Sequence, residues 1–370
     1  MFKRVLLTGA SGFLGNIILA RLLVDYSCEI SLLLRTGNSK EAVTNVAMNY
    51  LHHSSLGQKQ PDLNRVSVFT CDSPGEYIPD DFYTTMGEFD TIIHAAGCVD
   101  YFDKNQLNIG NIQYTENMIS LAYKVGAQKF IFLSTAFSSG YREEMIPEKI
   151  HVPPFNDPTH YTFSKRHAEE LVHNSGIAYY IMRPSIVIGH SKTGFYNGKR
   201  YGLYQQWMLM EKLFHDHYIR HWHYVASEAK VQLLHCDSFE EQFFSAMEYL
   251  PENSCVNIVS DSNAAPTYRQ VTDLWFEHVL KPESITYYSN YDDLDVNELS
   301  RKQRMLLGLI RKNTDLAARK WDFETTHAQK LKQLGVKFED VTLASIKRCQ
   351  DDFVKNSINM QNYIKRFFPL

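Results

Sequence analysis

The fold of this chain is decided by the stretch FKRVLLTGASGFLG, residues 2–15. It opens on an apolar run that predicts a buried strand, and residues 16–24 then carry apolar side chains at helical spacing. Gly9 permits a tight turn between them, Gly12 lets a pyrophosphate approach the backbone, and Gly15 lets the helix pack closely on the strand. A strand, a glycine-rich turn and a helix in this order predict a dinucleotide-binding Rossmann fold.

A tyrosine and a lysine stand four residues apart in the segment YTFSK, residues 161–165. On a helix this spacing puts both side chains on one face, where their tips can reach a shared site. A nearby cation favours a phenolate, so the tyrosine is expected to exchange a proton near neutral pH. That property suits general acid–base catalysis on a carbonyl or an alcohol. By itself the pair is also typical of a solvated helix, so its interpretation depends on the other motifs.

The glycine spacing and the Tyr-x-x-x-Lys pair together resemble the short-chain dehydrogenase/reductase superfamily, in its extended branch. The resemblance runs from about Phe2 to at least Asp261. It implies an α/β fold, a doubly wound parallel Rossmann sheet with a smaller, mostly helical substrate lobe. It also implies that a set of residues at the ends of the strands binds the cofactor. These are Thr8, Gly9, Ser11, Gly12, Phe13, Leu14, Gly15, Arg35, Asp72, Ala95, Ala96, Gly97, Tyr161, Lys165, Pro184 and Ile186.

The same resemblance implies catalytic roles. Tyr161 corresponds to the general acid, and Lys165 to the residue that activates the phenol and binds the nicotinamide ribose. A predicted strand ends in two hydroxyls, one of which would hydrogen-bond the substrate oxygen; we favour Thr135, with Ser134 as the alternative. Asn111 matches the structural asparagine of the family, which holds a water in the proton relay behind the lysine.

The end of the second predicted strand indicates which nicotinamide cofactor is used. An NAD enzyme usually carries an acidic residue there, about 20 residues beyond the glycines. This chain instead has Arg35, and an arginine can hold a 2′-phosphate bidentately. We therefore expect NADP(H), with NAD(H) still possible. Asp72, after the third predicted strand, resembles the family acid near the adenine ring, although an acid in a loop can also form a turn.

Composition narrows the class of protein. The chain has 370 residues, 44% of them hydrophobic, and a formal net charge of −4, which gives no general attraction to nucleic acid. Its six cysteines show no C-x-x-C spacing, so we expect neither a metal site nor a disulfide framework. The first strand begins almost at Met1, and no apolar run approaches the ~18 residues that a membrane span needs. These features predict a cytoplasmic protein without a membrane span.

The order of predicted elements indicates two lobes. Strands and helices alternate over residues 1–189, which predicts the NADP(H)-binding core, and residues 231–262 are expected to return to it. The remaining segments, 190–230 and 263–370, are expected to form a discontinuous, mostly helical substrate lobe.

The substrate is indicated by the segments RPSIVIG, residues 183–189, and TGFYN, residues 193–197. Their wording resembles the fatty acyl-CoA reductase and carrier-protein thioester reductase branch, which implies NADPH-dependent reduction of an acyl thioester to an aldehyde or alcohol. The thioester would be supplied by CoA or by a carrier protein. Two alternatives stay open: a dehydrogenase or epimerase acting on a nucleotide sugar or other alcohol, and a non-catalytic dinucleotide sensor. The oligomeric state cannot be read from the sequence.

Residues 201–224 are unusually rich in aromatic side chains interleaved with histidines. They could form an aromatic lid over a long acyl chain, or a helix whose aromatic stripe packs into the core of the lobe. His217 and His221 have the spacing of a helical metal-binding pair, but no glutamate motif accompanies them, so a solvated or stacking role is expected.

Overall fold

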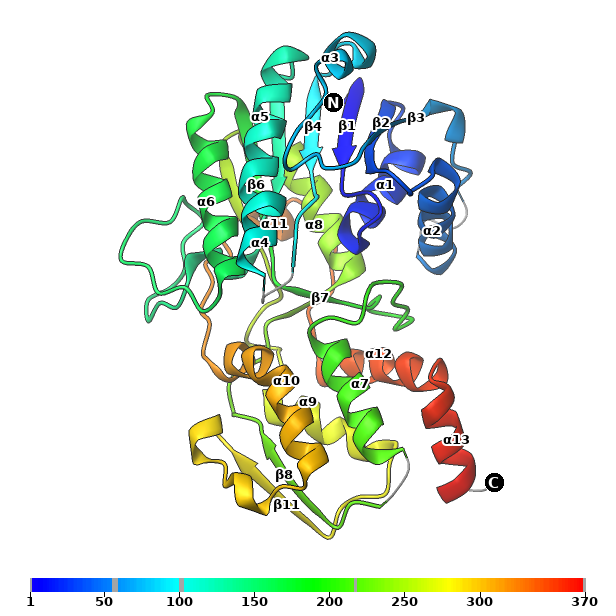
Figure 1. Cartoon of the computed structure of the whole chain (residues 1–370), viewed down its shortest axis with the longest axis vertical. Helices are drawn as coiled ribbons and strands as arrows, with labels where there is room; N and C mark the ends of the chain where they lie inside the picture. Colours follow the sequence, from blue (N-terminus) through cyan, green and yellow to red (C-terminus); the bar gives the residue numbers. More distant parts are fainter. Residues whose placement is uncertain (1, 55–58, 100–102, 216–217, 369–370) are drawn as a thin grey trace. The chain divides into compact units, whose positions relative to one another are not determined.

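The computed structural model describes residues 2–54, 59–99, 103–215 and 218–368 (Figure 1). The chain divides into two compact units, and each is described by itself. The first unit comprises Met1–Ser185, Cys236–Val259 and Phe323–Phe338. The second comprises Ile186–His235, Ser260–Asp322 and Glu339–Leu370.

The described part of the first unit is built on a seven-stranded sheet in the order β10-β6-β5-β4-β1-β2-β3, with every neighbouring pair parallel. The order 3-2-1-4-5-6 within it is that of a Rossmann fold, which confirms the predicted sheet. The strands are β1 (Arg4–Thr8), β2 (Glu29–Arg35), β3 (Val66–Cys71), β4 (Thr91–His94), β5 (Lys129–Leu133), β6 (Ala178–Pro184) and β10 (Ser254–Ile258).

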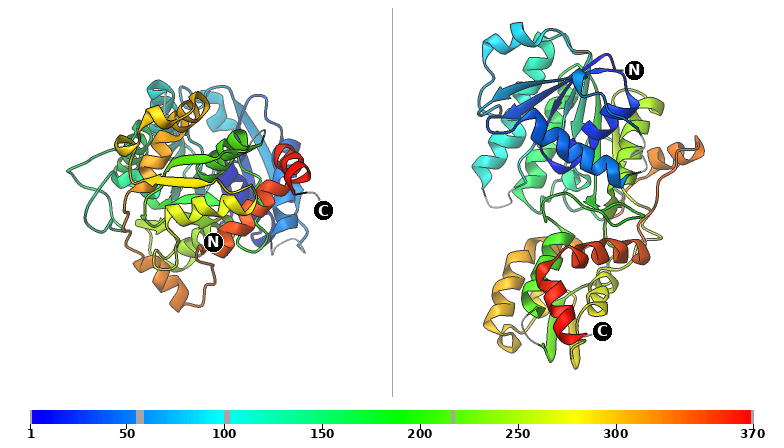
Figure 2. Two further views of the ribbon diagram at one scale, coloured as in Figure 1. Left: turned by 90° about the horizontal axis from the view of Figure 1, so that it is seen from below. Right: turned by 90° about the vertical axis from the view of Figure 1, so that its right-hand side faces the viewer.

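Helices cover both faces of this sheet, with α5 and α6 on one face and α1 and α8 on the other (Figures 1 and 2). The inner strands β1, β4 and β5 are therefore buried on both sides, which explains their largely apolar sequences, whereas the edge strand β3 is only partly buried. The helices are α1 (Phe13–Asp25), α2 (Lys40–His53), α3 (Asp80–Met86), α4 (Lys104–Leu107), α5 (Tyr114–Lys124), α6 (His160–Asn174), α8 (Cys236–Tyr249) and α11 (Thr326–Gln333). Three short helical segments are η1 (Leu63–Arg65), η2 (Asn108–Gln113) and η3 (Ala136–Ser139).

The strand order reverses between β1 and β4. Thr8, at the end of β1, lies opposite His94, at the end of β4. The connections from these two strands run to opposite sides of the sheet, so a crevice for a ligand is expected outside their carboxyl ends. The glycine-rich turn follows β1 at this point.

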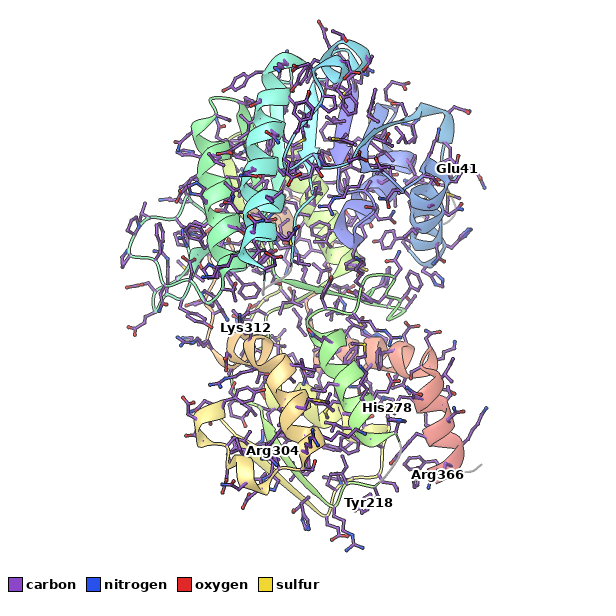
Figure 3. The ribbon with its side chains drawn as sticks, in the orientation of Figure 1. Glu41, Tyr218, His278, Arg304, Lys312 and Arg366 are labelled. Carbon is purple, nitrogen blue, oxygen red and sulfur yellow. The ribbon has the colours of Figure 1, made fainter. Side chains whose placement is uncertain are left out.

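The second unit is mostly helical and contains two parallel strand pairs, β7 with β9 and β8 with β11. Its strands are β7 (Ile186–Ile188), β8 (His221–Val225), β9 (Leu233–His235) and β11 (Ser284–Tyr288). Its helices are α7 (Leu203–Phe214), α9 (Tyr268–Asp273), η4 (Leu274–Glu277), η5 (Tyr291–Asp293), η6 (Val296–Glu298), α10 (Arg301–Ala318), α12 (Leu343–Lys355) and α13 (Ile358–Phe367). Arg304 and Lys312 mark α10 in Figure 3. No helix in the described ranges is long and apolar enough to cross a lipid bilayer.

The aromatic segment 201–224 contributes to α7 and β8. It does not form the single helix that was expected if its aromatic stripe packs into the core of the lobe. Trp207 and Trp222 are almost completely buried in the core of the second unit, together with Trp275. Tyr201, by contrast, is 53% exposed. Packing in the core therefore explains most of the stripe. His217 lies outside the described residues.

Residues 178–188 form two strands, β6 and β7, which are divided at Ser185. β6 pairs with β5 and β10 in the main sheet, whereas β7 pairs with β9 in the second unit. Pro184 ends β6, and proline has no N–H to continue the ladder. The backbone N–H of Ser185 donates to the carbonyl of Ile258, and Ile186 already pairs with Gln232. The first of the three segments of the first unit therefore ends at Ser185, whereas the predicted boundary was at residue 189.

Two other boundaries differ from the predicted ones. Residues 231–235 belong to the second unit, and the chain returns to the first unit only at Cys236, where α8 begins. Phe323–Phe338, expected in the substrate lobe, packs with the first unit. In this segment the backbone N–H of His327 donates to Glu148 Oε2 at 2.8 Å, and the Asn257 amide donates to the Glu324 carbonyl at 3.1 Å. The segment is still helical, as α11 shows, and these hydrogen bonds to distant residues attach it to the first unit.

Candidate active site

The glycine-rich turn is built by close backbone contacts. Gly9 has a φ of +76°, and a Cβ there would lie 2.5 Å from backbone atoms of Ala95 and Ala96. A Cβ on Gly15 would lie 2.1 Å from the carbonyl oxygen of Gly9. Gly12 precedes α1 and has no side chain to cap it, so the start of the helix can face a pyrophosphate. The other predicted fingerprint residues lie in this turn or in the first helical turn: Ser11, Phe13 and Leu14.

Thr8 and His94 join the ends of β1 and β4. The Thr8 hydroxyl lies 2.8 Å from His94 Nδ1 and accepts a hydrogen bond from the backbone N–H of Ala96 at 3.2 Å. His94 is fully buried, and burial together with the charge of Lys165 lowers its pKa to about 3, so the imidazole is neutral near pH 7. The Thr8 side chain thus holds the two strand ends together. No role was predicted for His94, because a histidine at the end of a strand belongs to no recognisable sequence motif.

Arg35 ends β2 with its side chain exposed. The backbone N–H and the side-chain amide of Asn38 both donate to its carbonyl oxygen, at 3.1 and 3.0 Å. Burial raises the pKa of Tyr114, and the charge of Arg35 opposes that rise, so the two side chains are near each other. Asp72 is exposed directly after β3, and Glu41 lies on the first turn of α2 (Figure 3). Among the described residues no carboxylate pairs with the Arg35 guanidinium, which leaves it available to a phosphate.

Tyr161 and Lys165 lie on α6, one turn apart, as predicted. A reciprocal capping box between Thr159 and Thr162 fixes the start of the helix. Tyr161 is half-buried, whereas Lys165 is only 4% exposed. The ammonium of Lys165 donates to the carbonyl of Leu133 at 2.6 Å. Burial lowers the pKa of Lys165 from 10.5 to about 7, so this group can gain or lose a proton near neutral pH.

The two hydroxyls after β5 differ in what they contact. Ser134 donates its hydroxyl to a carboxylate oxygen of Glu169. Thr135 accepts a long hydrogen bond, 3.4 Å, from the backbone N–H of Phe137, and its hydroxyl proton has no acceptor among the residues described. Thr135 can therefore donate to a substrate oxygen, while Ser134 is already engaged within the protein. This contact pattern favours Thr135 over Ser134.

Asn111 lies in the π-helical segment η2, a local widening that often marks functional sites. Its side-chain oxygen accepts from the backbone N–H of Cys98 at 2.8 Å, and its amide donates to the Cys98 carbonyl and to the Ser164 hydroxyl. Ser164 precedes Lys165 on α6. A Cβ on Gly97 would lie 2.8 Å from the Asn111 side-chain oxygen and 3.7 Å from Lys165 Nζ. Asn111 thus joins the loop after β4 to α6.

Sequence analysis missed the buried ion pair of Glu169 and Arg183. Both side chains are at most 1% exposed, and Arg183 Nη2 lies 2.7 Å from Glu169 Oε2. Burial alone would raise the pKa of Glu169, but the charge and hydrogen bonds of Arg183 outweigh it and hold that pKa below its usual value. The spacing of Tyr161, Lys165 and Glu169, each four residues after the last, is a signal that could have found the carboxylate.

The last two predicted cofactor residues fall in different units. Pro184 ends β6 in the first unit, whereas Ile186 begins β7 in the second. The site described above therefore lies within the first unit, and the contribution of Ile186 stays a prediction.

The fold and the site together define an NAD(P)-dependent oxidoreductase of the extended short-chain dehydrogenase/reductase type. The chain belongs to the family described as Male sterility protein, which matches residues 7–239. It is 29% identical over 222 residues to fatty acyl-CoA reductase wat of Drosophila melanogaster, covering 50% of this chain and 43% of the relative. It is 28% identical over 236 residues to fatty acyl-CoA reductase 1 of Xenopus laevis, covering 52% and 45%. The chain thus matches less than half the length of these relatives.

Solved structures share the fold at lower identity. The terminal R domain from the myxalamid PKS-NRPS biosynthetic pathway has a TM-score of 0.72 at 19% identity, with 96% of this chain and 91% of that chain covered. The Bordetella bronchiseptica enzyme WbmG, solved in complex with NAD, has a TM-score of 0.61 at 16% identity, with 96% and 95% covered. These similarities support the fold across nearly the whole chain.

Proposed function

We propose that the protein is an NADPH-dependent reductase of acyl thioesters, with Tyr161 as the general acid. The observation that carries the proposal is the burial of Lys165 one helical turn after Tyr161, with its ammonium on the carbonyl of Leu133. Thr135 lies two residues after Leu133 in the sequence, and its hydroxyl can donate a hydrogen bond. An acid, a cation and a hydrogen-bond donor close to one strand end suit the protonation of a carbonyl oxygen.

The residues of the first unit fit a dinucleotide. The turn from Gly9 to Gly15 leads into the start of α1, where the helix N-terminus suits a pyrophosphate. The guanidinium of Arg35, which pairs with no carboxylate among the described residues, suits the 2′-phosphate of NADPH. We therefore prefer NADPH over NADH. When bound, the nicotinamide supplies the hydride.

The protein groups then act on the thioester. Thr135 donates a hydrogen bond to the carbonyl oxygen, and Tyr161 transfers its proton to that oxygen as the carbonyl carbon gains the hydride. The charge of Lys165 stabilises the phenolate that remains. Loss of the proton from the new hydroxyl and cleavage of the C–S bond release an aldehyde and a thiol. The balance is one thioester, one NADPH and one proton giving one aldehyde, one thiol and one NADP⁺. A second hydride and proton would convert the aldehyde to an alcohol.

The substrate class rests on the relatives. Two matched relatives are named fatty acyl-CoA reductases, and the R domain in the comparison belongs to a biosynthetic pathway of the PKS-NRPS type. Both support an acyl thioester, delivered either by CoA or by a carrier protein. The alternative is a nucleotide-sugar dehydrogenase or epimerase, which would have the same fold. An activity assay with both kinds of substrate distinguishes it from a thioester reductase.

The test is a substrate panel followed by the near-ultraviolet absorbance of NADPH. The panel contains octanoyl-CoA, palmitoyl-CoA, the matching aldehydes and UDP-glucose. We expect NADPH oxidation with the acyl-CoAs and the aldehydes. NADPH oxidation with neither, together with conversion of UDP-glucose in the presence of NAD⁺, would overturn the thioester assignment.

A further inference from the structure

Behind the predicted site lies a buried polar network centred on Glu169. Its oxygen Oε1 accepts hydrogen bonds from the hydroxyls of Ser134 and Ser138, the latter at 2.8 Å. Arg183 donates through Nε to both carboxylate oxygens at 3.1 and 3.2 Å, and through Nη2 to Oε2 at 2.7 Å. Arg183 Nη1 also donates to the carbonyl of Pro147 at 3.3 Å. Almost every hydrogen-bonding position of this carboxylate is therefore occupied from inside the protein.

The network touches the predicted catalytic residues from two sides. Glu169 follows Lys165 by four residues on α6, so the carboxylate and the ammonium lie on one helix face. Ser134 precedes Thr135 at the end of β5, and its bond to Glu169 fixes the backbone from which Thr135 projects. A carboxylate buried with a lysine acts on it through a medium of low dielectric, where the attraction is stronger than in water.

We propose that Glu169 is a positioning residue: it keeps the Ser134 hydroxyl turned inward, so that Thr135 alone meets the substrate, and its charge supports the ammonium of Lys165. Arg183 balances the carboxylate and keeps it ionised in the interior. The inference rests on the proposed function, because it assigns Glu169 a part in the same reaction.

Two histidines and a cysteine around the network are neutral near pH 7. Burial and the neighbouring arginines lower the pKa of His151 to about 3, and burial raises the pKa of Cys255 to about 11. His94, on the far side of Lys165, is also held neutral by burial. Beyond Arg183, Glu148 adds a further negative charge, which is bound by the backbone N–H groups of Asn257 and His327. Glu169 is thus the carboxylate whose charge reaches Lys165 most directly.

The chain offers a matched control in Glu240. This carboxylate is also buried in the first unit, where it accepts from the Tyr50 hydroxyl at 2.5 Å and from Arg21 at 3.0 Å. Among the described residues, its hydrogen-bond and ion-pair partners are Tyr50 and Arg21, neither of which belongs to the predicted site. Burial raises the pKa of Glu240 to about 7, so this carboxyl is only partly ionised near pH 7. Glu240→Gln therefore removes a buried, arginine-paired carboxyl without touching Lys165 or Ser134.

The first experiment compares the pH dependence of kcat for Glu169→Gln and Glu240→Gln. We expect Glu169→Gln to lower kcat about tenfold at pH 7 and to move the basic limb of the profile down by about one pH unit, because the ammonium loses its counter-charge. Glu240→Gln should leave the limb in place, whatever it does to stability. If both variants lose stability equally and neither moves the limb, Glu169 has only a structural role and the proposal fails.

Two additions keep the test decisive. If Glu169→Gln alone does not fold, the double variant Glu169→Gln/Arg183→Met removes both charges together and should show the same shifted limb. A double-mutant cycle of Glu169→Gln and Lys165→Met, measured by urea unfolding at pH 6 and pH 9, requires no turnover. We expect a stabilising coupling that is larger at pH 6, where Lys165 is charged. Equal coupling at both pH values would overturn the inference, even if the thioester assignment held.

Discussion

The two halves of the candidate site are built in opposite ways. The half formed by the turn after β1 depends on backbone: Gly9 and Gly15 leave no room for a Cβ atom. The half formed by α6 depends on side chains, with Lys165 and Glu169 held in the interior by charge and hydrogen bonds. The difference teaches that binding of the cofactor and proton transfer should fail through different substitutions.

The largest expected effect is that of Gly15→Ala. The new Cβ would stand 2.1 Å from the Gly9 carbonyl oxygen, so backbone must move. We expect a loss of about 3 kcal/mol or more in the free energy of unfolding, together with loss of NADPH binding. Urea unfolding and fluorescence titration with NADPH measure the two effects. Gly308→Ala on α10 is the control, because that position is open, and it should be neutral or slightly stabilising. Wild-type stability and binding in Gly15→Ala would refute the backbone account of this half.

The next largest effect is the pH dependence of the free energy of unfolding, which tests the half of the site formed by α6. Between its folded pKa of about 7 and its unfolded value of 10.5, Lys165 binds a proton only in the unfolded chain. The free energy of unfolding should therefore rise with pH across this window, on the order of 2 kcal/mol between pH 7 and 9. Lys165→Met should lack this rise.

Lys129→Met is the matched control, since its side chain is 42% exposed and pairs with Glu252. Its pKa is raised and not lowered, so the rise between pH 7 and 9 should persist in this variant. Parallel pH curves for the wild type and Lys165→Met would show that the lysine is not poised near neutral pH.

The smallest expected effect is on the affinity for NADPH and comes from substitution of Arg35. Arg35→Ala should raise the Kd for NADPH by about 10- to 100-fold, because a charged hydrogen bond to the 2′-phosphate is lost. NADH has no 2′-phosphate and serves as the control, with its Kd changing by less than about threefold. Equal changes for both cofactors, measured by fluorescence titration, would remove Arg35 from the specificity assignment.

Local patterns in the sequence predicted the parts of the structure that depend on local geometry. The turn after β1 and the place of Tyr161 and Lys165 on one helix follow from spacing within a few residues. The parallel sheet was expected from the family resemblance and from the alternation of strands and helices over residues 1–189. The division between β6 and β7 at Ser185 was not predicted, because an apolar run does not reveal which sheet each half joins. β11 was missed because its partner, β8, lies far away in the sequence.

The site shows the same limit. Lys165 could be predicted because it belongs to a sequence motif. The ion pair of Glu169 and Arg183 joins a helix to a strand, and nothing in the sequence indicates that these two residues pair. The resemblance already favoured Thr135 over Ser134, and the contact of Ser134 with Glu169 gives a structural reason for that preference. The spacing of residues in the sequence predicts which side chains share a face of one helix or strand. Contacts between different helices and strands become known only from the structure.

The central claim is hydride transfer to an acyl thioester with Tyr161 as the acid. The most direct measurement is incubation with palmitoyl-CoA and NADPH carrying deuterium at both C4 positions, followed by mass spectrometry of the product. We predict deuterium at C1 of the aldehyde or alcohol, and a loss of turnover of at least about 100-fold in Tyr161→Phe with the Kd for NADPH unchanged. A product without deuterium, or turnover by Tyr161→Phe close to that of the wild type, would contradict the account.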